Sequence, residues 1–191
     1  MQKILRNIVG LLLLQVLTGC AVTHNFGPYI GKVVDAETKA PIEGAAVYIT
    51  CSTKTPNPGG ITSHYADFKE VLTDQHGEFH LELRVTTFRL GHLWKPEPVV
   101  RVFKPGYGIF PHHQGTKSDI LVEGTSHILP VNEYVNITLP KLKTRKERRD
   151  NYFHIRISFF PEIPFEKRKN VFRLENVERV YLGFKPTPEP Q

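Results

Sequence analysis

Cysteine and histidine are the side chains in this sequence with the widest range of chemistry. The chain of 191 residues contains two cysteines, Cys20 and Cys51, and nine histidines. It has no Cys-x-x-Cys pair and no cysteine–histidine spacing typical of a zinc site. Cys20 ends an apolar run, whereas Cys51 follows the strand-like segment Val47-Tyr48-Ile49-Thr50. The two cysteines therefore indicate different roles.

The segment before Cys20 has the pattern of an export signal. Lys3 and Arg6 precede the apolar run IVGLLLLQVL at residues 8–17, which Gln15 interrupts. A membrane-spanning helix needs about 20 apolar residues, so this run is too short to span a bilayer. A basic start followed by a short apolar run is typical of a signal peptide, although an ordinary one ends in small residues such as Ala-x-Ala.

The end of this segment, Leu17-Thr18-Gly19-Cys20, resembles the lipobox of bacterial lipoproteins. The resemblance implies that Cys20 receives a diacylglyceryl group, that residues 1–19 are removed as a signal peptide, and that the new N-terminus is acylated. Each buried CH₂ contributes about 0.8 kcal/mol, so two or three acyl chains would anchor the protein stably. A cleaved ordinary signal or an uncleaved anchor with an incidental cysteine is the alternative.

The residue after Cys20 and the net charge limit the location and the partners. Ala21 stands where an aspartate favours inner-membrane retention of enterobacterial lipoproteins, so the resemblance favours the outer membrane in a Gram-negative host. Loss of Lys3 and Arg6 with the signal removes two positive charges and no acid, so the formal net charge falls from +6 to +4. This excess is too small to indicate a nucleic-acid partner, and we expect none.

Acylation of Cys20 would leave Cys51 without a partner for an intrachain disulfide. We expect Cys51 to be a buried small hydrophobic residue on a strand. An intermolecular disulfide or a reactive thiol is the alternative.

Three polar side chains in HGEFH could form a row of metal ligands. His76, Glu78 and His80 would share one face of a strand, because alternate residues point the same way. However, Gly77 indicates a turn, which would place His76 outside the strand.

A second set of side chains has the residue types with which intradiol dioxygenases bind iron, namely Tyr107, His112, His113 and Tyr134. The R-G-x-x-T-D and P-x-H-x-H signatures of that family are missing. We therefore expect no catalytic residues, no metal site and no cofactor.

Strand signals, separated by turn residues, extend through most of the chain. They fall at residues 29–35, 45–51, 68–72, 78–84, 98–104 and 131–139. In 78–84 apolar and polar residues alternate, so Phe79, Leu81 and Leu83 should face a core. Two loops rich in turn residues or histidine, 52–67 and 108–118, separate these strands. Short strands with frequent turns indicate an antiparallel β-sandwich.

Three stretches, GKVVDAETKAPIEGAAVYI, TDQHGEF and VVRVFKPGY, follow one another in an order that resembles the carboxypeptidase regulatory-like domain. The resemblance covers residues 28–140 and implies a transthyretin-like sandwich of about seven strands. In that family the domain accompanies an enzyme or a receptor, or stands alone in cell-envelope proteins. The zinc motifs H-x-x-E and H-E-x-x-H of peptidases are missing from this chain.

The remaining sequence predicts a tether before the sandwich and a helical tail after it. Residues 20–27 form the tether, and residues 141–184 form the tail, which should pack on the sandwich. In the tail, Thr144 and Glu147 fit a capping box. Residues 165–182 predict a helix whose apolar side chains are Val171, Leu174, Val177 and Tyr181. Residues 185–191, with three prolines, should be disordered.

The basic run 141–149 admits two interpretations. Its lysines and arginines could cover a solvated helix face, or they could contact phosphate groups of lipid or lipopolysaccharide.

Taken together, the residues predict a membrane-anchored envelope protein with a non-catalytic binding or scaffolding domain. Its partners would be the bilayer, through acylated Cys20, and a protein or glycan bound by the 52–67 and 108–118 loops. A metal-dependent envelope enzyme that uses histidine and tyrosine residues of the loops is the alternative.

Overall fold

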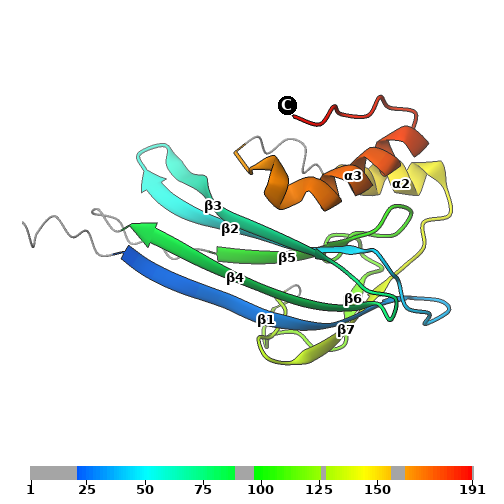
Figure 1. The fold of residues 1–191 in the computed structure, drawn as a ribbon, viewed down its shortest axis with the longest axis horizontal. Helices are drawn as coiled ribbons and strands as arrows, with labels where there is room; N and C mark the ends of the chain where they lie inside the picture. The colour runs from blue at the N-terminus through cyan, green and yellow to red at the C-terminus, as the bar shows by residue number, and fades with distance from the viewer. Residues whose placement is uncertain (1–20, 89–96, 126–127, 156–161, 191) are drawn as a thin grey trace, which may run out of the picture.

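A computed structural model describes residues 21–88, 97–125, 128–155 and 162–190. The expected signal peptide and Cys20 lie outside these residues. The described chain forms seven strands and two helices (Figure 1). They are β1 (Ala21–Asp35), β2 (Ala46–Asn57), β3 (Gly60–Leu72), β4 (Glu78–Phe88), β5 (Glu97–Phe103), β6 (Lys117–Ser118), β7 (Tyr134–Leu139), α2 (Arg145–Tyr152) and α3 (Phe165–Tyr181).

The strands form two sheets that pack as a sandwich, which confirms the predicted mainly β fold followed by helices. One sheet has the order β4-β1-β7-β6, and the other has the order β3-β2-β5. All strand pairs are antiparallel except β1 and β7, which run parallel from Ile30 opposite Tyr134 to Asp35 opposite Leu139. The helices cover the outer face of the β3-β2-β5 sheet and add a third layer (Figure 1).

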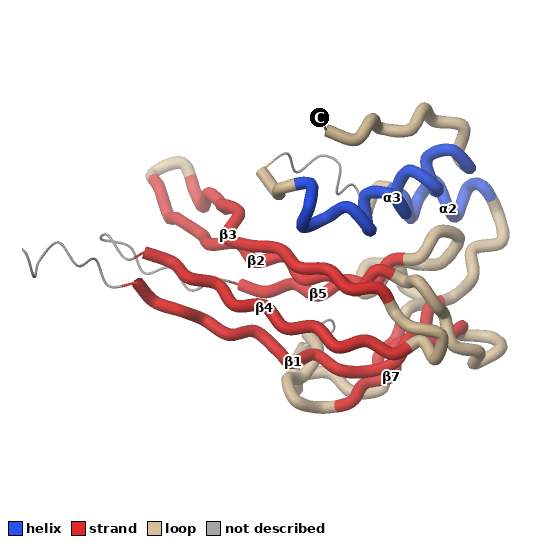
Figure 2. The backbone as a smooth tube through the Cα atoms, viewed as in Figure 1, coloured by secondary structure: helices blue, strands red, loops and turns tan. Residues whose placement is uncertain are grey.

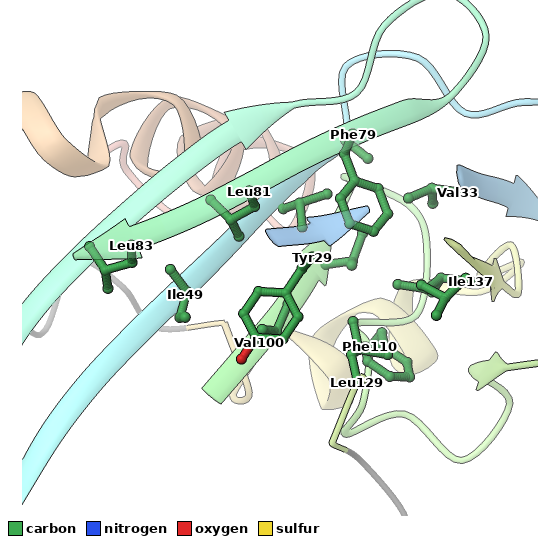
Figure 3. Packing of buried hydrophobic residues seen from close by; sticks show 14 of the residues in the cluster. Tyr29, Val33, Ile49, Phe79, Leu81, Leu83, Val100, Phe110, Leu129 and Ile137 are labelled. Carbon is green, nitrogen blue, oxygen red and sulfur yellow. The ribbon is translucent and has the colours of Figure 1, made fainter. Parts of the chain in front are cut away.

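The main core lies between the two sheets and follows from alternation along the strands. Phe79, Leu81 and Leu83 are all buried in it, as predicted, and the polar residues between them are exposed (Figure 3). Ile49 of β2 and Ile137 of β7 contribute to the same cluster. Because these strands place every second side chain between the sheets, burial of apolar surface stabilises the sandwich.

Two glycines are required where backbones approach closely. A Cβ atom on Gly31 would lie 2.1 Å from the carbonyl oxygen of Val135, so only glycine permits the β1–β7 pairing. Gly77 ends the turn before β4 with φ +76°, a conformation that glycine adopts without strain. In this turn the Asp74 carboxylate accepts hydrogen bonds from the backbone N–H groups of His76 and Glu78.

Asp35 has the same role at the end of β1, as expected of a turn aspartate. Its Oδ1 accepts hydrogen bonds from the backbone N–H groups of Glu37 at 2.8 Å and Thr38 at 2.9 Å. These bonds, that of Thr38 above all, hold the pKa of the Asp35 carboxyl below its usual range.

Two segments that the sequence analysis assigned to a tether and a loop are strands instead. Residues 21–27 belong to β1 and pair with the second half of β4. Most of 52–67 forms a hairpin in which β2 and β3 pair from Ser52 opposite Tyr65 to Asn57 opposite Gly60. Threonine and serine are frequent in 52–67, and backbone pairing orders this segment because threonine suits a strand as well as a loop.

The helical tail packs on the sandwich, as expected. The predicted capping box is present: Thr144 Oγ1 accepts from the Glu147 backbone N–H, and the Glu147 carboxylate accepts from the Thr144 backbone N–H. A second apolar cluster joins Tyr48 and Phe68 of the sheet to Tyr152 and Val171 of the tail. Strand β2 is therefore buried on both faces.

The orientation of α3 differs from the predicted one. Val177 and Tyr181 are 56% and 49% exposed, so they do not belong to the packed face. That face instead includes Glu175 and Glu178, each only 1% exposed. The apolar pattern was misleading because both buried carboxylates have hydrogen-bond or ion-pair partners in α2.

The C-terminal segment, expected to be disordered, follows α3. Residues 185–190 return along the helix (Figure 2). Asn176 exchanges two hydrogen bonds with the backbone of Thr187, and Arg173 pairs with Glu189. Neither described helix is long and apolar enough to cross a membrane.

Candidate ligand cavity between sheet and tail

Cys51 is the only sequence-predicted cysteine that the structure describes. It is a free thiol, 1% exposed, in the core between the sheets, which confirms the prediction of a small buried residue. Burial, with a smaller contribution from the charge of Asp67, raises the pKa of the thiol to about 12. The thiol therefore stays protonated at neutral pH, which does not favour a reactive role.

The histidine row on β4 does not converge on one point. His80 pairs with Glu82 at 2.9 Å, His76 contacts Gln75, and Glu78 accepts a hydrogen bond from Tyr134. Among the residues that the structure describes, no three histidine, cysteine, aspartate or glutamate side chains lie close enough to hold a metal ion.

The tyrosine and histidine set with iron-binding residue types is also divided among other contacts. Tyr107 lies by Asp35, and the pKa of its phenol is raised by burial and by that carboxylate. His113 Nδ1 accepts a hydrogen bond from the backbone N–H of Gly115 at 3.1 Å. His112 stacks on His154, with ring centroids 5.3 Å apart.

The basic run is largely engaged with the chain itself. Arg148 forms an ion pair with buried Glu178, and its guanidinium lies over the ring of Tyr181. Arg145 donates to the backbone carbonyl oxygen of Leu182. These contacts attach α2 to α3, so they favour a structural role for part of this run.

A cavity of about 480 Å³ lies between the outer face of the β3-β2-β5 sheet and the helical tail. Its volume is in the range of small-molecule sites. Its walls come from all three strands of the sheet and from the tail. They are formed by Tyr48, Thr50, Cys51, Ser52, Ser63, His64, Tyr65, Val99, Arg101, Phe153, His154, Ile155, Glu162 and Ile163.

Arg101 is the cationic group of this cavity. Its Nη1 donates to Thr50 Oγ1 at 3.0 Å, and its Nε donates to His112 Nε2 at 3.2 Å. Within the described part of the chain, no carboxylate forms an ion pair with Arg101. Because His112 accepts at Nε2, this nitrogen carries no proton, and the neutral ring has its proton on Nδ1. Both hydrogen-bond partners of the guanidinium are thus neutral.

Tyr48 adds a second unusual polar group. Its hydroxyl is buried and has no hydrogen-bond partner within the described residues. Burial raises the pKa of this phenol, whereas the nearby positive charge of Arg101 lowers it. Unpaired buried polar groups are rare in folded proteins, so this hydroxyl is an unusual feature of the residues around the cavity.

Other carboxylates close to the cavity are already used to hold α3 in place. Glu70 accepts hydrogen bonds from the backbone N–H groups of Asn170 and Val171, and burial raises its pKa. Glu175 accepts from the hydroxyl of Tyr152, to which Arg179 also donates. These bonds position the wall that the tail supplies.

This site was not predicted from the sequence. Tyr48 belongs to β2, Arg101 belongs to β5, and His154 belongs to the tail. These polar residues are therefore far apart in the sequence. One signal was present: residues 46–49 are apolar at every position, which is typical of a strand covered on both faces. In such a sheet, Arg101 within VVRVF would lie under the covering layer.

Comparisons of the chain with protein families, with curated proteins and with solved structures found no match. The resemblances to bacterial lipoproteins and to the carboxypeptidase regulatory-like domain therefore rest on the motifs alone.

Proposed function

We propose that this protein is a cell-envelope lipoprotein, anchored to the bilayer through acylated Cys20, whose sandwich binds a small ligand without catalysing a reaction. The lipobox-like segment supports the anchor, and Ala21 favours the outer membrane in a Gram-negative host. The motifs that resemble the carboxypeptidase regulatory-like domain support a binding role, because none of the residues in these motifs implies catalysis.

The cavity under the tail is the observation that carries the binding role. It combines a volume of about 480 Å³ with mostly apolar and aromatic walls and a few polar groups. Ligand sites typically have this combination, in which the polar groups orient the ligand.

This cavity also changes the kind of ligand that we expect. From the sequence, we expected a protein or glycan on the 52–67 and 108–118 loops. Most of 52–67 is a hairpin, and Ser63, His64 and Tyr65 of that hairpin contribute to the cavity wall. A small molecule held in the cavity between sheet and tail fits this arrangement better than a large partner.

Photo-crosslinking tests the proposal on the full-length protein in isolated membranes. The probe is octanol that carries a diazirine, because a neutral apolar molecule reports on the cavity regardless of charge. We expect peptide mapping to find the label on β2, β3, β5 and residues 153–155. Val99→Trp, which fills the cavity with an indole ring, should reduce this labelling about tenfold, equivalent to about 1.4 kcal/mol.

The matched control is Val177→Trp on the exposed face of α3, which should leave the labelling unchanged. Labelling that is spread over the surface, or that Val99→Trp does not reduce, would refute the cavity as the binding site.

A further inference from the structure

We infer that the cavity binds a small apolar carboxylic acid, with the carboxylate on Arg101 and the apolar body against the aromatic and aliphatic wall. This inference rests on the proposed function and specifies its ligand.

The charge of the lining favours an anion. Arg101 is half-buried, and its described hydrogen-bond partners, Thr50 and His112, are both neutral acceptors. A partly desolvated guanidinium without an anionic partner is unfavourable, so an anion gains affinity there. The one acidic residue of the described lining is Glu162, which is exposed.

The number of charges favours a carboxylate. Arg101 is the one described lining residue with an obligatory positive charge. A single guanidinium fork matches the charge and the planar geometry of a carboxylate, and such pairs can form two parallel hydrogen bonds. A dianionic phosphate would leave a negative charge without a cation.

Tyr48 and His154 lie in the same region. The hydroxyl of Tyr48 has no hydrogen-bond partner among the described residues, and it feels the positive charge of Arg101 as well as the negative charges of Glu175 and Glu70. His154 lines the cavity and stacks on His112, which in turn accepts from Arg101.

The apolar part of the wall favours an apolar body on the ligand. It consists of Tyr48, Tyr65, Val99, Phe153, Ile155 and Ile163. A sugar hydroxyl placed against these side chains would stay unpaired, at a cost of about 1–3 kcal/mol. An alkyl chain or an aromatic ring avoids that cost.

Competition against an octanoic acid probe that carries a diazirine tests the inference in the same membranes. The competitors are octanoate, octanol and octylamine, which share one alkyl chain and differ in the charge of the head group. We expect octanoate to compete at a concentration about tenfold lower than either of the others. Equal competition by octanol, or stronger competition by octylamine, would overturn the carboxylate assignment.

Variants then place the carboxylate. Arg101→Gln should remove the preference for octanoate, whereas Arg101→Lys should retain part of it, because a lysine keeps the charge but loses the fork. The control is Arg149→Gln, which removes an exposed arginine and should leave the preference intact. A preference that survives in Arg101→Gln would place the carboxylate elsewhere and overturn the inference. If Arg101→Gln does not accumulate, the competition in the unaltered chain still decides.

The outcomes separate this inference from the proposed function. If the neutral octanol probe labels the cavity and octanoate shows no advantage, the cavity binds ligands but the carboxylate assignment is wrong. If neither probe labels the cavity, both proposals are wrong.

Discussion

Tyr48 combines two properties that rarely occur together, complete burial and a hydroxyl without a hydrogen-bond partner among the described residues. A buried unpaired polar group costs about 1–3 kcal/mol, so it is normally removed by substitution or satisfied by a contact. Removing this hydroxyl should relieve that cost.

Tyr48→Phe should therefore not destabilise the protein, because it removes only the unpaired oxygen. We expect the free energy of unfolding to stay equal or to rise by up to about 1 kcal/mol. Thermal unfolding of the purified full-length chain, followed by circular dichroism, measures the change. The control Tyr152→Phe removes hydrogen bonds to Glu175 and Arg179 and should lower the stability. A loss in Tyr48→Phe as large as that in the control would show that Tyr48 has a partner.

Asp35 gives the sandwich a defined sensitivity to acid. The Thr38 backbone N–H holds the pKa of this carboxyl below its usual range. A depressed pKa in the folded state contributes stability that is present above the unfolded pKa of about 3.9 and is lost as the pH falls through the folded value. Asp35→Asn should flatten the decline in melting temperature below about pH 4. An acid decline in the variant as steep as in the parent chain would contradict this role.

At the scale of elements, one ion pair joins the two described helices. The side chains of Arg148 and Glu178 are 13% and 1% exposed, and Glu178 also accepts a hydrogen bond from the backbone N–H of Gly106. The pair thus connects α2, α3 and the loop after β5. Removing one member would leave the other charge buried and uncompensated.

Glu178→Ala should consequently destabilise the tail by about 3–5 kcal/mol, the usual cost of breaking a buried ion pair. The matched control is Glu166→Ala on the same helix, where the side chain is 81% exposed and lies 3.9 Å from Lys169. That change should cost less than about 1 kcal/mol. Urea unfolding of both variants measures the difference, and similar costs would exclude Glu178 as the residue that docks α3.

The same elements show how far the sequence determined the fold. Period-two alternation identified Phe79, Leu81 and Leu83 as core residues, and the capping box located the start of α2, because both signals depend on neighbouring residues alone. The buried face of α3 was missed because Glu175 and Glu178 are buried only through partners distant in sequence. The cavity was missed for the same reason, since Tyr48, Arg101 and His154 meet only after the tail packs on the sheet.

At the scale of the whole molecule, the proposed anchor predicts a covalent change at one residue. Intact-mass measurement of the purified protein should show a polypeptide that starts at Cys20 and carries the mass of its acyl groups. In Cys20→Ala this added mass should be absent, and the protein should leave the membrane fraction. Cys51→Ala should behave like the parent chain, because that thiol is buried in the core. A variant at Cys20 with unchanged mass in the membrane fraction would refute the anchor.

The pairing of β1 from its first described residue has a consequence for how such a protein would stand on a bilayer. Ala21 already lies opposite Phe88, so the ordered sheet begins directly after Cys20. The start of β1 lies at the same end of the molecule as the β2–β3 turn (Figure 1). That turn is followed by Ile61, which is 70% exposed. Acyl chains on Cys20 would therefore be joined to the sheet without a flexible linker. The domain would then lie close to the lipid, with this hairpin turn facing the bilayer.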